Sequence, residues 1–278
     1  MRKMIMTLCV ACTFATPVTL AATYYGAPMT VGSGSARVYV IENTSGTVEV
    51  GIEADSTAFV NLASDSHLHL DLPTSDSFDV SPIDHIDLGF ALNGHPGGPW
   101  SDAADVPENS YWAVPHFDVH FMTISDKEAD KIIIPNPTDS SDLAYVVPAA
   151  SDLAAGYALG LNSGISGEGS HWAAGGEFSD FPAPFDYNFL YGFYDGKMTF
   201  EEPMVAQTFL ADLKNGLTSD VLQAFSVSST NPAFGDQYFI RYDAGSDVFR
   251  MGVTTIPEPS TFLMVGLGLL VFSLCKRY

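Results

Sequence analysis

The stretch from residue 112 to residue 125 constrains the fold more than any other part of the chain. After Pro115, the polar residues His116, Asp118 and His120 alternate with three apolar residues. Side chains of a strand point to opposite faces in turn, so the polar residues share one face and the apolar residues the other. The aromatic and β-branched content also favours a strand over a helix. The stretch therefore predicts a half-buried strand whose outer face carries two imidazoles and a carboxylate.

Similar alternation elsewhere predicts a mainly β fold of antiparallel sheets, arranged as a sandwich or a barrel. The expected strands cover residues 36–43, 47–53, 59–62, 66–72, 83–92, 189–193, 197–201, 237–242 and 248–254. One or two short helices are expected, beginning at the capping-box sequence Ser125-Asp-Lys-Glu128 and covering 203–213. The region 135–184 is rich in Gly, Ser, Asp and Pro, which predicts long loops.

Residues 1–22 are predicted to form a secretory signal peptide. Arg2 and Lys3 precede an apolar run, and small residues follow at the cleavage site. Cleavage after Ala21 fits as well as cleavage after Ala22. No internal repeat and no Pro/Ser-rich linker interrupts the next part, so residues 23–256 are predicted to form one extracytoplasmic domain.

The C-terminal residues 257–278 combine three features in a fixed order. Pro257-Glu258-Pro259 precedes an apolar run from Ser260 to Cys275, and a basic pair follows. At ~1.5 Å per residue the run makes a single transmembrane helix of roughly 24 Å, which can cross a bilayer core of about 30 Å with snorkelling basic side chains. With the signal peptide, these features resemble the PEP-CTERM sorting signal. The resemblance implies an exosortase-type sorting enzyme as partner, export through the inner membrane, transient anchoring, and then a cell-surface or secreted protein.

The predicted exported body contains no cysteine and few basic residues. All 3 cysteines lie in the two end segments, which excludes disulfides, thiolate metal sites and a cysteine nucleophile from the body. Without the end segments, 7 basic residues remain against 32 acidic ones, a net charge of −25. This charge excludes nucleic acid and anionic membrane surfaces as partners.

All 7 histidines of the chain lie in the body, each near an Asp, a Gly or another His. Neutral imidazole backed by a carboxylate suits zinc or another divalent transition metal. Along a strand His116 and His120 are about 13 Å apart, too far to share one ion, so one of them should bind beside Asp118 or a loop histidine. The alternative is a hydrogen-bonded polar cluster without metal. For His67 and His69 a solvent-exposed face is the simpler explanation.

Over residues 31–256 the body also resembles a poorly characterised family of exported bacterial proteins. The resemblance rests on Asp84-His-Ile-Asp-Leu, Gly94-His-Pro, Pro115-His-Phe-Asp-Val-His-Phe, Gly169-Ser-His-Trp and the segment 191–204. The matching family positions are His85, His95, His116, Asp118, His120, His171 and Glu202. Met122 departs from the pattern, which usually has an aromatic residue there. One member is regulated by a stress sigma factor and forms rings, so the resemblance implies a homo-oligomer.

The candidate site combines the polar face of the central strand with two Gly-rich loops that each deliver one histidine. The expected metal ligands are His95, His116, His120 and His171. Behind them, His85 and Asp118 are expected to orient the ligands, and Asp118 and Glu202 are the candidate catalytic bases. The expected cofactor is zinc or another divalent transition metal.

Three functions are consistent with these features. The first is an exosortase-sorted surface or matrix protein whose partners are exopolysaccharide or envelope components. The second is a metal-dependent hydrolase or lyase. The third is a carbohydrate-binding β-domain that uses Trp100, Trp112 and Trp172, for which packing in the core is the simpler explanation.

Overall fold

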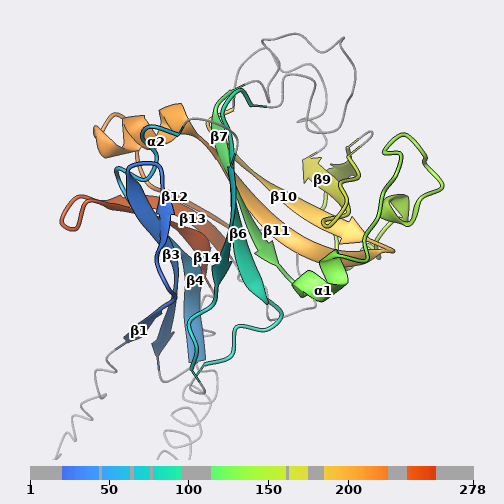
Figure 1. Cartoon of the computed structure of the whole chain (residues 1–278), viewed down its shortest axis with the longest axis horizontal. Coiled ribbons are helices and arrows are strands. Elements are labelled where there is room, and N and C mark those ends of the chain that lie inside the picture. Colours follow the sequence, from blue (N-terminus) through green and yellow to red (C-terminus); the bar gives the residue numbers. More distant parts are fainter. Residues whose placement is uncertain are drawn as a thin grey trace, which may run out of the picture.

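The computed structural model describes residues 21–43, 46–62, 66–75, 78–94, 114–160, 163–174, 185–224 and 237–254. Within these residues the chain forms two antiparallel seven-stranded sheets that pack face to face (Figure 1). The prediction of a mainly β fold with antiparallel sheets and few helices is confirmed.

Sheet A contains the first and the last strands of the described chain. Its strands, in spatial order, are β1 (Ala22–Tyr25), β3 (Gly34–Asn43), β4 (Gly46–Asp55), β14 (Val248–Thr254), β13 (Gln237–Asp243) and β12 (Val221–Ala224), with β2 (Met29–Val31) paired to β3. The predicted hairpins β3–β4 and β13–β14 are confirmed. The pairing of β4 with β14 joins the N-terminal hairpin to the C-terminal hairpin.

Sheet B carries the predicted central strand. Its strands, in spatial order, are β5 (Ser66–Asp71), β6 (His85–Ala91), β7 (His116–Met122), β11 (Lys197–Ala206), β10 (Tyr187–Tyr194), β9 (Ser170–Ala174) and β8 (Tyr157–Leu159). Because β7 lies between β6 and β11, the strand prediction for this stretch is confirmed and the strand is internal to the sheet.

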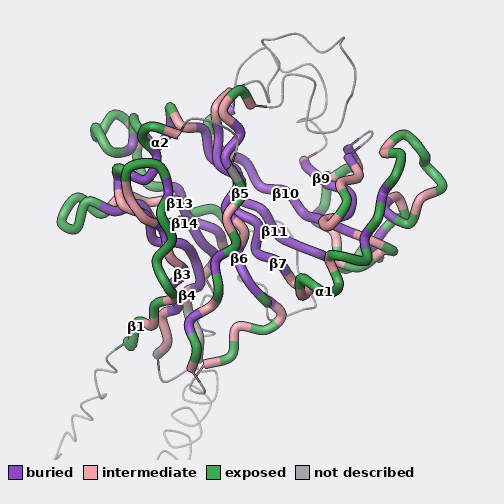
Figure 2. The backbone as a smooth tube through the Cα atoms, viewed as in Figure 1, coloured by how far each residue is buried: buried purple, intermediate pink, exposed green. Residues whose placement is uncertain are grey.

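A single large apolar core fills the space between the two sheets. The ring of Phe117 lies 4.4 Å from the ring of Phe59, which in turn lies 5.5 Å from that of Phe249 in sheet A. The outer face of β7 is buried as well, so the strand is buried along its whole length (Figure 2). On that outer side, the ring of Phe185 lies 5.2 Å from the ring of His116. The prediction of a half-buried strand is therefore wrong for its polar face, because segments distant in sequence cover it.

The helices are short: α1 (Asp126–Ala129), the 3₁₀ turn η1 (Leu143–Tyr145) and α2 (Gln207–Lys214). The capping box of α1 is confirmed, since the N–H and hydroxyl of Ser125 donate to Glu128 Oε2 at 3.0 and 2.8 Å. The second helix begins at Gln207 rather than at Pro203, because residues 203–206 extend β11. Pro203 has no N–H to donate, and the ladder between β11 and β7 has no pair at this position.

Two further predictions require correction. Residues 59–62 form a turn rather than a strand; Phe59 there is buried because its ring fills the core. The region 135–184 contains β8 and β9 in addition to loops. Its Gly and Ser content hid β9, a five-residue strand that is held in place by pairing with β10.

Several predicted segments lie outside the described residues. They include almost all of the signal peptide, Pro257-Glu258-Pro259, and the predicted transmembrane helix Ser260–Cys275. In the part of the chain that the structure describes, no helix has both the length and the apolar character needed to cross a membrane.

Candidate metal centre

The outer face of sheet B gathers histidines and carboxylates from strands that are far apart in the sequence. Strand pairing aligns His69 with Asp87 and Asp87 with His120, which places these residues in one row across β5, β6 and β7. On the other side of β7, His171 of β9 pairs with Gly192 of β10. The row therefore continues through β11 and β10 to the far side of the sheet.

One group of this face, which we call the buried cluster, consists of His120, Glu168, His171 and Glu202. His120 Nε2 lies 3.4 Å from Glu202 Oε1 and 3.9 Å from Glu168 Oε2. His171 Nε2 lies 3.4 Å from Glu168 Oε2 and 3.9 Å from Glu202 Oε2. His120, His171 and Glu202 each offer a ligand atom, and these atoms lie within 4.8 Å of one another. These three ligand atoms thus lie around one point, and Glu168 borders it through its contacts with both histidines.

The imidazole of His171 is oriented by the backbone. Its Nδ1 lies 3.0 Å from the carbonyl oxygen of Ser163, so Nδ1 carries the proton and donates it there. Nε2 is then the basic nitrogen, and it faces Glu168 and Glu202. Hydrogen bonding of the distal ring nitrogen to a carbonyl is the usual arrangement of a metal-binding histidine.

An aromatic ring spaces the two histidines of the buried cluster. The Phe200 ring centroid lies 4.8 Å from that of His120 and 4.9 Å from that of His171. This ring fits because residue 192 is glycine, where a Cβ atom would lie 2.0 Å from the Phe200 ring. Gly192 therefore lets Phe200 separate the imidazoles while their Nε2 atoms converge on the same carboxylates.

The environment of the buried cluster disfavours the charged forms of Glu202 and His120 but favours the charged form of Glu168. Burial raises the pKa of Glu202 well above its ordinary value, and the negative charges of Asp118 and Glu168 raise it further. Burial also lowers the pKa of His120. Burial raises the pKa of Glu168, but the hydrogen bond to His171 and the charges of the imidazoles outweigh it, so the pKa is lowered. The buried cluster thus combines two imidazoles with two carboxyl groups whose pKa values are shifted in opposite directions.

A second group, which we call the shallow cluster, consists of His69, His85, Asp87 and Asp126. Asp126 Oδ1 lies 3.6 Å from both His69 Nδ1 and His85 Nε2. Asp87 lies 3.3 Å from His69 Nδ1 through Oδ1 and 3.5 Å from His85 Nε2 through Oδ2. Burial lowers the pKa of His85, but hydrogen bonds to Asp87 and Asp84 outweigh it and raise the pKa to about 9. Burial likewise raises the pKa of Asp87, but hydrogen bonds to His67 and His85 outweigh it and lower the pKa.

The structure brings together only some of the predicted site residues. His120, His171 and Glu202 meet in the buried cluster, whereas His85 belongs to the shallow cluster. His116 pairs with Asp118, with His116 Nε2 3.2 Å from Asp118 Oδ1 and His116 Nδ1 2.6 Å from the carbonyl oxygen of Val114. Asp118 in turn hydrogen-bonds Glu202, so this pair borders the buried cluster. His95 lies outside the described residues.

The sequence analysis missed Glu168, Asp87 and Asp126. Glu168 stands between Gly167 and Gly169, which both have positive φ, at +91° and +107°. That loop brings it beside His171, three residues later. An acidic residue between two glycines, just before Ser-His-Trp, is a signal that could have been used. His67 and His69 were assigned to a solvent-exposed face; both side chains are exposed, yet both contact Asp87.

Trp172 does not form a binding platform. It is buried, its indole N–H donates to Ser170 Oγ at 3.2 Å, and its ring packs against Phe193. For Trp172, packing in the core is confirmed. Trp100 and Trp112 lie outside the described residues, so the part of the carbohydrate-binding hypothesis that concerns them stays a prediction.

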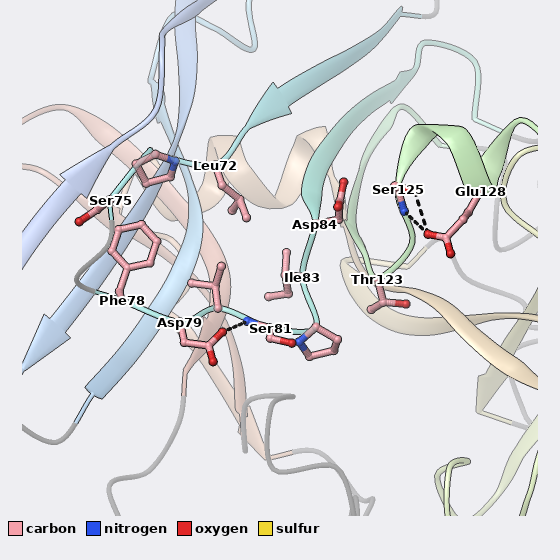
Figure 3. A pocket seen from close by; sticks show the side chains of 13 residues that line it. Leu72, Ser75, Phe78, Asp79, Ser81, Ile83, Asp84, Thr123, Ser125 and Glu128 are labelled. Carbon is pink, nitrogen blue, oxygen red and sulfur yellow. Dashed lines mark hydrogen bonds between the residues drawn. The ribbon is translucent and has the colours of Figure 1, made fainter.

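A groove opens next to the shallow cluster but contains no histidine (Figure 3). Its lining includes Phe78, Ile83 and Asp84 on one side and Ser125 and Glu128 of the α1 capping box on the other. Asp84 connects the groove to the shallow cluster, because its Oδ1 lies 2.9 Å from His85 Nδ1.

Comparison with known proteins bears on the C-terminal end of the chain. A model of the PEP-CTERM protein-sorting motif matches residues 255–277. The chain carries a PEP-CTERM sorting motif. This supports an exported protein that is anchored in the membrane and sorted by an exosortase-type enzyme. A search of curated proteins and a search of solved structures each gave no match. For the β-sheet body, the resemblance to a family of exported proteins stays a prediction.

Proposed function

We propose that the sheet body of this exosortase-sorted protein binds a divalent transition metal ion in the buried cluster, as a metal-holding protein of the cell surface. The ligands are His120 and His171 through Nε2, with Glu202 and Glu168 as carboxylate ligands. Two imidazoles with carboxylates suit zinc and its neighbours in the first transition series.

The spacing of the ligand atoms supports a single ion. Two ligands that each lie 2.0–2.1 Å from a tetrahedral zinc ion are about 3.4 Å apart. Two of the imidazole–carboxylate distances in the buried cluster are 3.4 Å, and the other two are 3.9 Å. Small rotations of the side chains would bring all four atoms to the required spacing.

The proposal rests mainly on the lack of Lys and Arg partners for the carboxylates of the buried cluster. The body has 7 Lys and Arg residues, and all of them lie in described segments. No ion pair among the described residues joins a Lys or Arg to Glu168 or Glu202; these carboxylates face imidazoles and, for Glu202, the carboxyl group of Asp118. Because the remaining segments of the body contain no Lys or Arg, the chain has no fixed cation for this cluster. An external cation would supply the missing charge.

A metal-dependent hydrolase or lyase is the second candidate. It is favoured because the buried cluster has one carboxylate more than a three-ligand metal site needs. If His120, His171 and Glu202 hold the ion, Glu168 is free to accept a proton from a metal-bound water. Its side chain is also the most exposed of the four, at 18%. Asp118, the other base predicted from the sequence, lies between His116 and Glu202.

Metal analysis of the purified full-length protein tests the proposal. We expect about one equivalent of zinc to survive dialysis in the wild type and to be lost in His171→Ala and in Glu202→Gln. Retention of that zinc by both variants would show that the buried cluster does not bind it. Zinc-dependent hydrolysis of model esters that disappears in Glu168→Gln, with zinc retained, would favour the enzyme over the metal-holding protein.

The sorting role has a separate test. Changing Glu258 and both flanking prolines should prevent processing and surface display, because the extended Pro-Glu-Pro segment is the part exposed to the sorting enzyme. Unchanged processed mass and unchanged display would contradict it. This result does not depend on the metal.

A further inference from the structure

We infer that the shallow cluster is a second, solvent-accessible binding site for a divalent transition metal, independent of the buried cluster. Its ligands are His69 Nδ1, His85 Nε2 and Asp126 Oδ1, with Asp87 beside them. The ligand atoms of His69, His85 and Asp126 lie within 4.8 Å of one another.

Strand pairing forms the site. His69 on β5 pairs with Asp87 on β6, and His85 lies two residues before Asp87, on the same face of the sheet. The two imidazole rings are therefore diagonal neighbours, with centroids 4.3 Å apart. Asp126, the first residue of α1, approaches them from outside the sheet.

The spacing fits one ion. The distances of 3.6 Å from Asp126 Oδ1 to both imidazole nitrogens are close to the ~3.4 Å between two ligands of a tetrahedral zinc ion. Asp87 adds contacts of 3.3 and 3.5 Å to the same two nitrogens. Asp87 Oδ1 is buried and has no hydrogen-bond partner among the described residues. It is therefore available as a fourth ligand.

The imidazole of His85 is already oriented for coordination. Asp84 Oδ1 lies 2.9 Å from its Nδ1, which directs Nε2 toward Asp126 and Asp87. A carboxylate on the distal nitrogen of a coordinating histidine is the common arrangement at zinc sites. No ion pair within the described chain joins Asp84, Asp87 or Asp126 to a Lys or Arg. The ion would bridge the outer strand β5, its neighbour β6 and α1.

The two clusters differ in their exposure to solvent. The side chains of His69 and Asp126 are 41% and 72% exposed, whereas the histidines and Glu202 of the buried cluster are nearly inaccessible. Solvent or a small ligand can therefore complete the coordination of an ion in the shallow cluster. Such a site should also exchange its metal faster than the buried cluster.

Zinc stoichiometry of the full-length protein and its variants tests the inference, with zinc alone as the probe. With zinc at saturating concentration and before dialysis, we expect two equivalents in the wild type, one in His69→Ala and in Asp126→Asn, and one in His171→Ala. His67→Ala is the matched control, because its side chain is also exposed and on β5 and contacts Asp87, but offers no atom to the ion; it should keep two. Asp126→Asn changes an exposed side chain, so loss of folding does not obscure the result.

The outcomes separate the two sites. If Asp126→Asn and His69→Ala bind as much zinc as the wild type, the shallow cluster does not bind zinc, whatever the result for His171→Ala. If the wild type binds one equivalent that Asp126→Asn loses and His171→Ala keeps, zinc binds in the shallow cluster and not in the buried cluster. A wild type without bound zinc contradicts both.

Discussion

On the outer face of sheet A, Glu53 lies between two guanidinium groups. Arg37 and Arg250 approach its two carboxylate oxygens at 2.6 and 2.5 Å. Beside it, Glu49 accepts a hydrogen bond from Arg241. On the outer face of sheet B, Glu202 is even more deeply buried, yet the described side chains around it are imidazoles and other carboxylates.

The two faces show two ways to hold a buried carboxylate. Sheet A supplies a permanent positive charge from the chain, so its glutamates are satisfied in every condition in which the protein folds. Sheet B supplies only groups that can lose their charge, so its carboxylates take up either a proton or an added cation. From this difference we expect sheet B to respond to metal and pH, and sheet A to respond to neither.

The largest expected effect is stabilisation by zinc. A ligand that binds only the folded state at 100 times its Kd adds about 2.7 kcal/mol to the free energy of unfolding. For a chain of this size that raises the Tm by roughly 5–10 °C. Thermal unfolding with zinc and with a chelator measures the difference. His171→Ala should lose the part of the shift that the buried cluster contributes. A wild-type Tm that is the same with zinc and with a chelator would remove the contrast between the sheets.

A second prediction concerns Glu201, which points to the opposite face of β11 from its neighbour Glu202. Glu201 pairs with Phe121 and Tyr191, so its carboxyl lies in the core, where burial raises its pKa to about 8. The folded protein keeps a proton there that the unfolded chain loses near its ordinary pKa of 4.5. Stability from this group is therefore complete at low pH and falls as pH rises from about 4.5 to 8.

Glu201→Gln should remove that pH dependence. We expect the variant to be more stable than the wild type by about 2 kcal/mol at pH 6 and equally stable at pH 4. Urea unfolding at the two pH values measures this, in the presence of a chelator. A variant that is less stable at pH 6 would mean that the ionised carboxylate is satisfied inside the core.

Arg250→Ala tests sheet A. It leaves Glu53 with Arg37 alone, which should cost about 1–2 kcal/mol, reduced because the arginine side chains are partly exposed. The loss should be the same with zinc and with a chelator, because no described ligand cluster lies on this face. A zinc-dependent loss in urea unfolding would show that the two faces are coupled.

The smallest expected effect belongs to Asp84→Ala. Without this carboxylate the His85 ring loses its orienting hydrogen bond, and zinc affinity at the shallow cluster should fall about tenfold. Competition with a chromophoric chelator measures the Kd, and a His171→Ala background isolates the shallow cluster. Unchanged affinity would show that the packing around His85, and not Asp84, orients the ring.

The sequence predicted the parts of the site that depend on neighbours along the chain. Alternation in β7 correctly placed the side chains of His116, Asp118 and His120 on one face. The sequence analysis nevertheless placed both His116 and His120 in one expected ligand set, although about 13 Å separates them along a strand. In the structure His116 pairs with Asp118, while His120 faces Glu202, so only His120 enters the buried cluster.

The strand, its two faces and the sorting motif can be recognised in the sequence, because periodicity and short ordered motifs are local properties of a chain. Which carboxylates meet which imidazoles depends instead on tertiary contacts. Glu168 and His171 reach His120 through the pairing of β9, β10, β11 and β7, and Asp126 reaches His85 through the packing of α1. These contacts depend on strand order and register between distant segments, which hydrophobic patterning within one segment does not specify.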